Sequence, residues 1–334
     1  MAEKKKIHWL LILQGWAMLW VVIGHAGPSP TKDDFPPYAL FLHDFAYSFH
    51  MPLFIAISGF LFYLTRLSSK KWKYWPMLKE KLVRFGIPFL VFTIFGMVLK
   101  SVFSGSIDRA TTISLSEFAN AILYPYNGPM REFWFLATIM WYFALFPVWK
   151  LVLRYKWLSV VVLLGLAALS IWHPNSDFLA ISHASQHAFF FYGGIICSML
   201  YEKNADIVKK KGFAPISFLA GLCLYIVGRL WYVPLVMPLG GAVFSLAIAL
   251  WLDRINPKTF FTFRDYTYQI YLLGIFFNVF CSILRAKLEL PFGPMYIVSM
   301  IMGLYMPVLI SKLLEWINWK PLLLCVGLKQ KNNK

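Results

Sequence analysis

The chain has 334 residues, of which 59% are hydrophobic and only 14% are charged, and its mean hydropathy is +0.62. A soluble protein of this length needs far more polar surface to cover its core, so the composition excludes a soluble globular domain. The formal net charge is +17. What this positive charge implies about partners depends on where the Lys and Arg residues lie in the sequence.

Ten apolar segments, each roughly 16–22 residues long, could cross a hydrocarbon core of about 30 Å as helices. They are 7–25, 47–64, 82–103, 133–149, 157–172, 184–201, 213–228, 231–252, 266–284 and 290–310. Trp and Tyr lie at many of their ends, as in interfacial anchors. The sequence therefore predicts an all-α membrane protein, a polytopic bundle of about ten transmembrane helices in a single domain over 1–334.

The positive charges predict the orientation of this bundle. If the N-terminus is cytoplasmic, 25 of the 32 Lys and Arg residues fall in segments on the inner side of the membrane. This asymmetry follows the positive-inside rule and favours cytoplasmic N- and C-termini. We attribute the basic excess to anionic membrane lipids and expect no nucleic-acid partner.

The first apolar segment follows three lysines, as a signal peptide would, but His25-Ala26-Gly27-Pro28 is a poor cleavage site, so we expect a retained helix. On this helix Gln14 and His25 are three turns apart, on one face and roughly 16 Å apart. Such a face could line a polar passage. The alternative is that Gln14 bonds to a neighbouring helix and His25 reaches interfacial water.

The longest outer segments, 26–46 and 104–132, are predicted to be loops of the kind that form functional lids. The aromatic and basic segment 65–81, with Lys70-Lys71-Trp72, is predicted to lie along the lipid headgroups. Segment 321–328 is too short to span. Cysteines 197, 223, 281 and 325 have no CxxC spacing and are interpreted as packing residues.

The second apolar segment places His50 at the outer mouth, near the predicted level of His25, with Ser58 and Gly59 about 12 Å deeper. Small residues at that depth allow close approach of another helix or of an acyl chain. At the inner start of the third segment, Lys81 and Arg84 are at i and i+3 and could hold phosphates. The alternative for Ser58 and Gly59 is ordinary helix packing. The alternative for Lys81 and Arg84 is a positive-inside anchor.

Six of the seven histidines fall on the predicted outer side, which makes this side the place to look for proton transfer. Glu132 opens the fourth segment there, where it either stabilises a helix N-terminus or orients an imidazole. His183 and His187 have a spacing compatible with zinc, but no HExxH motif and no third ligand accompany them. We expect no metal.

These segments together resemble the acyltransferase 3 family of integral-membrane O-acyltransferases. The resemblance is sharpest over 13–25, 49–60, 81–88, 133–136 and Tyr192-Gly193-Gly194. It implies transfer of an acyl group from cytoplasmic acyl-CoA to a hydroxyl of a glycan outside. The family pairs a basic residue with a histidine on the first helix; here His25 is present, but Gln14 occupies the basic position. Lys81 and Arg84 match a family basic pair, and Gly274 stands where a histidine commonly follows Tyr271.

The resemblance predicts that Lys81 and Arg84 grip the phosphates of acyl-CoA, with acetyl-CoA the expected donor, and that its pantetheine arm passes Gln14 and Ser58. His25, oriented by His50 or Glu132, would be the general base on a glycan or lipid-linked sugar acceptor. An exporter or flippase of a polysaccharide or lipid-linked sugar is the alternative, and a sensor or scaffold is a third. The sequence does not determine which acceptor is used, how long the acyl chain is, whether transfer is direct or passes through a covalent intermediate, or what the oligomeric state is.

Overall fold

The computed structural model describes residues 7–29, 34–69, 73–102 and 111–330. These residues form helices and connecting turns, and none of them is in a β-strand, which confirms the all-α prediction. Part of the basic segment predicted to lie along the headgroups, Lys70-Lys71-Trp72, falls outside the described residues. The four cysteines are free thiols.

Fifteen α-helices are found in the described residues, joined by short 3₁₀ and π segments. Their bounds are α1 His8–His25, α2 Pro37–Tyr47, α3 His50–Phe62, α4 Tyr74–Lys81, α5 Ile87–Val102, α6 Leu115–Leu123, α7 Trp134–Ala144, α8 Phe146–Val152, α9 Lys156–Ile171, α10 Ile181–Lys203, α11 Phe213–Leu230, α12 Val236–Ile255, α13 Thr267–Leu288, α14 Phe292–Ile317 and α15 Lys320–Cys325.

Among the described residues, seven helical stretches are long and apolar enough to cross a membrane, which establishes a multi-pass membrane protein. The pair α7 and α8 would be an eighth span, bent by 53°. Helix α9 is apolar but has 16 residues, and the 23-residue α10 carries polar side chains such as His183 and His187. Each of the ten predicted segments thus contains a helix, while the count of ten crossings and the cytoplasmic termini stay predictions.

Two predicted loops contain helices, so those predictions were wrong over 37–46 and 115–123. Helix α2 begins with Pro37 at its first position, where proline is favoured because the missing N–H would be unpaired in any case. At the start of α6, the Ser114 hydroxyl accepts a hydrogen bond from the Glu117 N–H, 3.1 Å away, as in a capping box. The prolines and polar residues that indicated loops therefore mark helix starts.

The predicted span 133–149 is not one straight helix. It divides between α7 and α8, because Pro147 cannot donate the backbone hydrogen bond that would continue α7.

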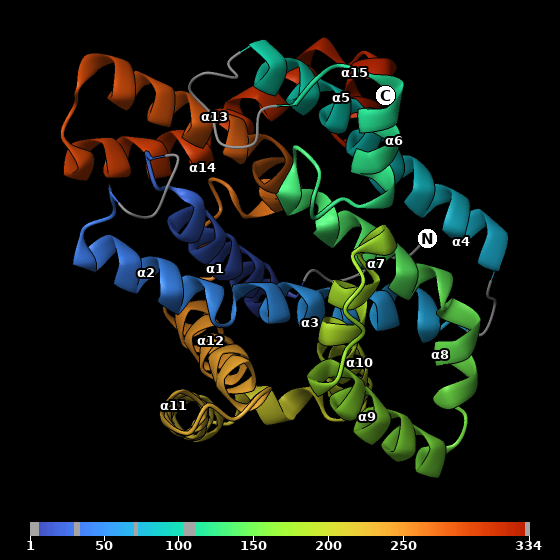
Figure 1. Cartoon of the computed structure of the whole chain (residues 1–334). Coiled ribbons are helices and arrows are strands. Elements are labelled where there is room, and N and C mark those ends of the chain that lie inside the picture. Colours follow the sequence, from blue (N-terminus) through green and yellow to red (C-terminus); the bar gives the residue numbers. More distant parts are fainter. Residues whose placement is uncertain (1–6, 30–33, 70–72, 103–110, 331–334) are drawn as a thin grey trace.

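Helix α1 lies at the centre of the molecule, in contact with α2, α3, α12, α13 and α14 (Figure 1). Helices α3 and α10 cross closely, since a Cβ atom on Gly59 would overlap the carbonyl of Phe191, and one on Gly194 would overlap that of Ala56. Helices α13 and α14 run side by side on the other flank of α1 (Figure 1). The C-terminal end of α1 is thereby enclosed by elements from distant parts of the sequence.

Candidate active site

A cavity of about 560 Å³ lies at the C-terminal end of α1, and we call it the histidine cavity. Four of the seven histidines line it: His25, His50, His183 and His187. Glu132 lines it as well. A smaller cavity of about 280 Å³ shares His25, Tyr47 and Glu132 with it and adds His43. The fold thus gathers five histidines around adjoining hollows, as the outer-side clustering of histidines in the sequence led us to expect.

The last turn of α1 is held by side chains of α13 and α14. The final carbonyls of a helix have no partner within the helix, so they need other donors. Here the carbonyl of Ile23 accepts from the Tyr296 hydroxyl at 3.1 Å, and that of His25 accepts from Asn278 Nδ2 at 3.0 Å. Asn278 is itself fixed, because its Oδ1 accepts from Ser299 at 3.1 Å. These bonds fix the backbone that carries the His25 ring.

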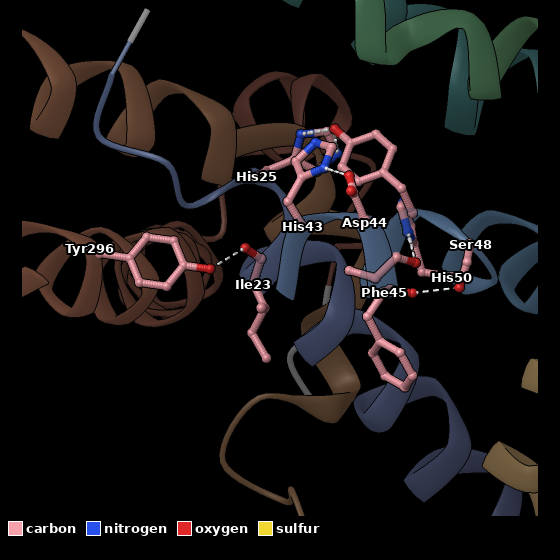
Figure 2. Close-up of polar contacts among 10 residues, drawn as sticks. Ile23, His25, His43, Asp44, Phe45, Ser48, His50 and Tyr296 are labelled. Carbon is pink, nitrogen blue, oxygen red and sulfur yellow. Dashed lines mark hydrogen bonds and ion pairs between the residues drawn. The ribbon is translucent and has the colours of Figure 1, made fainter. Parts of the chain in front are cut away.

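The hydroxyl of Tyr47 lies 3.1 Å from Nδ1 and 3.4 Å from Nε2 of His25, so it can share a hydrogen bond with either ring nitrogen, at the shorter distance with Nδ1. The ring of His43 stacks on Tyr47 with ring centres 4.1 Å apart, and that of His50 meets His25 edge-on at 6.2 Å. Figure 2 shows His25, His43 and His50 gathered above the end of α1. The predicted roles of His50 and Glu132 in orienting His25 stay predictions, and Tyr47 is a contact that the sequence did not reveal.

His50 is buried, with 1% of its surface exposed, and its protonation pattern follows from one contact. Its Nδ1 lies 2.6 Å from the carbonyl of Ala46, which can only accept, so Nδ1 carries the hydrogen. In the neutral ring, Nε2 then holds a lone pair. This atom has no hydrogen-bond partner among the described residues. A buried polar atom without a partner calls for an explanation, and a hydroxyl from a substrate would provide one.

His183 and His187 come from the first turns of α10 and line the same cavity. Their rings lie 4.4 and 5.2 Å from that of Trp134, and His187 Nδ1 donates to the carbonyl of His183 at 2.9 Å. Within the described residues, no three His, Cys, Asp or Glu side chains are grouped to hold a metal ion.

Glu132 lies in the 3₁₀ turn Arg131–Phe133 that leads into α7. Its backbone carbonyl accepts a hydrogen bond from the Tyr271 hydroxyl at 2.6 Å, which ties this turn to α13. Glu132 lines both the histidine cavity and the smaller one beside it. The structure therefore brings all three predicted catalytic residues, His25, His50 and Glu132, to the same hollow.

A separate cavity of about 340 Å³ lies nearer the N-terminal end of α1, and we call it the cation cavity. Its lining includes all four predicted binding residues: Gln14, Ser58, Lys81 and Arg84. Lys81 Nζ lies 4.4 Å from the centre of the Phe143 ring. No described acidic side chain forms an ion pair with Lys81 or Arg84, so their charges are available to an anion. The Ser58 hydroxyl donates back to the carbonyl of Phe54 at 2.9 Å.

The two cavities meet at a partition made of Val21, Met51 and Tyr271, which line both of them. Along α1, the residues that face these hollows include Gln14, Met18, Val21 and His25, and Val22 lines the histidine cavity beside them. The spacing of the first four, at four, three and four residues, places them on one helix face. One side of α1 therefore runs from the cationic end to the imidazole end.

Gly274 lines the histidine cavity, at the position where the sequence departs from the family pattern. A Cβ atom there would come within 2.8 Å of the carbonyl oxygen of Gly303 on α14. Because that approach is tighter than real Cβ contacts, this chain closes α13 on α14 where a histidine would need space.

Comparison with protein families gives a match over nearly the whole chain. The family model described as an acyltransferase domain, that of acyltransferase 3, matches residues 7–312. No curated protein and no solved structure gives a significant match. The residues that carried the resemblance lie around the two cavities or pack beside them, and the match confirms that resemblance. The chain belongs to the acyltransferase 3 family and is a membrane acyltransferase.

Proposed function

We propose that this protein transfers an acyl group, in the first instance acetyl, from cytoplasmic acyl-CoA to a hydroxyl of an extracytoplasmic or lipid-linked glycan. The protein would lie in the plasma membrane with both termini in the cytoplasm. One observation carries the proposal: a cation cavity and a histidine cavity lie end to end along one face of α1.

The cation cavity has the chemistry that a CoA ester needs. Lys81 and Arg84 would attract phosphates, for which guanidinium and ammonium groups are the usual partners. The amide of Gln14 and the oxygen of Ser58 could accept or donate hydrogen bonds along the pantetheine arm. Gln14, unlike the basic residue of the family pattern, would bind the arm through hydrogen bonds and without a charge.

The histidine cavity has the chemistry for deprotonating a hydroxyl. If Tyr47 keeps its shorter hydrogen bond, to Nδ1 of His25, then Nε2 would accept the proton as the acceptor oxygen bonds to the acyl carbon. The carbon–sulfur bond of the thioester then breaks, and the imidazolium returns the proton to the leaving thiolate, giving free CoA. The lone pair of His50 Nε2 would help to position the hydroxyl.

The test compares His25→Ala with His8→Ala, a matched change at the exposed start of the same helix. Purified variants are given labelled acetyl-CoA and a glycan extract, and label on the glycan is measured. We expect His25→Ala to lower the rate by about 10²–10⁴-fold, the usual contribution of a general base, and His8→Ala to leave it unchanged.

Full activity of folded His25→Ala protein would reject the role of His25. If the unaltered protein moves unmodified glycan across vesicles without labelling it, the protein is an exporter and the proposed reaction is wrong.

A further inference from the structure

A third cavity, of about 470 Å³, adjoins the cation cavity at Arg84, and we call it the C-terminal cavity. Four cations line it: Lys79, Arg84, Lys320 and Lys329. Between them the wall is apolar, with Pro76, Leu324 and Leu328 among its residues. Two of the cations come from the segment around α15, which lies beyond the matched acyltransferase domain.

The segment around α15 is held against the first turn of α13, where Tyr268 lines the cation cavity. The carbonyl of Val326 accepts a hydrogen bond from Gln269 Nε2 at 2.9 Å, and the Tyr268 hydroxyl donates to the carbonyl of Arg84 at 3.2 Å. Gly327 has φ +67°, a conformation that favours glycine, and any side chain there would collide with Tyr268. The C-terminal segment is therefore a fixed wall of this region.

The charge of the C-terminal cavity favours an anion. Glu80 is the one acidic residue in its lining, and its carboxylate is held by Arg66 at 2.6 Å and by Lys329 at 3.6 Å. Arg66 thus offsets the negative charge of Glu80. The lining contains four cations and no other acidic residue, so the cavity is positively charged. A phosphate ester with an attached flat ring would suit this combination of cations and apolar wall.

We propose that the C-terminal cavity binds the nucleotide end of acyl-CoA, with Lys320 and Lys329 contacting its 3′-phosphate. This inference rests on the proposed donor. Because Arg84 lines both cavities, one long ligand can place its diphosphate at Arg84, its pantetheine arm in the cation cavity and its nucleotide against Leu324 and Leu328. The segment beyond the family domain then contributes to donor selection.

The experiment measures binding of acetyl-CoA and of 3′-dephospho-acetyl-CoA to full-length protein in phosphatidylcholine vesicles. The test variant is Lys320→Gln with Lys329→Gln. The control is Lys210→Gln with Lys211→Gln, which removes the same charge from residues outside all these cavities. We expect the test variant to lose about five- to tenfold in affinity for acetyl-CoA and nothing for the dephospho ester. The control variant should bind both esters as the unaltered protein does.

An equal loss for both esters, or no preference of the unaltered protein for the 3′-phosphate, would overturn the inference. The measurement is repeated with phosphatidylglycerol in the vesicles. A preference that disappears there, with the lipid displacing the ester, would assign the cavity to a lipid phosphate and also overturn it. A third variant, Lys81→Gln with Arg84→Gln, separates the two proposals. If it weakens acetyl-CoA binding while the 3′-phosphate has no effect, the donor stands and only this inference fails; if the unaltered protein binds neither ester, both fail.

Discussion

At the scale of single residues, His25 is held from two directions. Its backbone carbonyl accepts from Asn278, and its ring shares a hydrogen bond with Tyr47. A catalytic group gains from such fixation because a bound reactant then meets it in one geometry. Tyr47 touches His25 and is a positioning residue in the proposed reaction.

Tyr47→Phe removes the hydroxyl and keeps the ring that stacks on His43. A hydrogen bond of this kind contributes about 1 kcal/mol, so we expect turnover to fall about five- to tenfold, with the KM for acetyl-CoA unchanged. Steady-state kinetics on labelled acetyl-CoA would measure both constants. Tyr38→Phe, at the other end of α2, is the control and should have no effect. A change in KM alone would contradict a role in positioning His25.

Some of these residues could be predicted from the sequence, and some could not. His25, His50, Lys81 and Arg84 were found because polar residues near apolar spans are few. Asn278, in the apolar segment 266–284, carried the same signal and was missed. Tyr47 was not predictable in this way, because aromatic residues are common at membrane boundaries and only the fold shows which one meets a histidine.

At the scale of elements, the close crossing of α3 and α10 depends on Gly194. A Cβ atom at Gly194 would overlap the Ala56 carbonyl, whereas one at the neighbouring Gly193 would meet no atom within 4 Å. The two glycines are adjacent in the sequence, yet only one of them is required by packing.

Gly194→Ala should therefore destabilise the protein by about 1–3 kcal/mol through overpacking. Gly193→Ala should be neutral or stabilise it by up to about 1 kcal/mol, since alanine favours the helix. Thermal unfolding of the two variants in the same detergent would test this difference. Equal unfolding temperatures would show that α3 and α10 do not approach as closely as described.

Hydrophobic length predicted the long helices well, but it could not predict their interruptions. The helix in 37–47 was hidden because its proline was taken as a loop signal, although proline at a first helical position is a start signal. The 53° bend between α7 and α8 lies just before Pro147, which is inside a continuous apolar run. Hydrophobicity alone predicts one span for such a run. The missing backbone N–H of the proline is what divides it into two helices.

At the scale of the whole molecule, the number of crossings determines where the C-terminus lies. Ten crossings return it to the side of the N-terminus, whereas the seven most apolar stretches of the described residues alone would leave it on the opposite side. The charge asymmetry favours ten.

We therefore expect a fluorescent protein fused to the C-terminus to fluoresce in the cytoplasm, and alkaline phosphatase fused there to be inactive. Phosphatase placed between α9 and α10, near residue 175, should be active outside. The reverse pattern at the C-terminus would show an odd number of crossings. It would also move the C-terminal cavity away from cytoplasmic acyl-CoA.

The partition of Val21, Met51 and Tyr271 has a consequence for the cell. A water-filled bore from one face of a membrane to the other would let protons leak and would discharge the gradient that drives ATP synthesis. Two apolar side chains and one phenol ring line both cavities at this point, and we expect them to limit such a leak. The methionine side chain has three rotatable bonds, so Met51 could change rotamer to admit an acyl chain and then return. In the proposed reaction, acyl groups would then pass between the cavities while the membrane keeps its proton gradient.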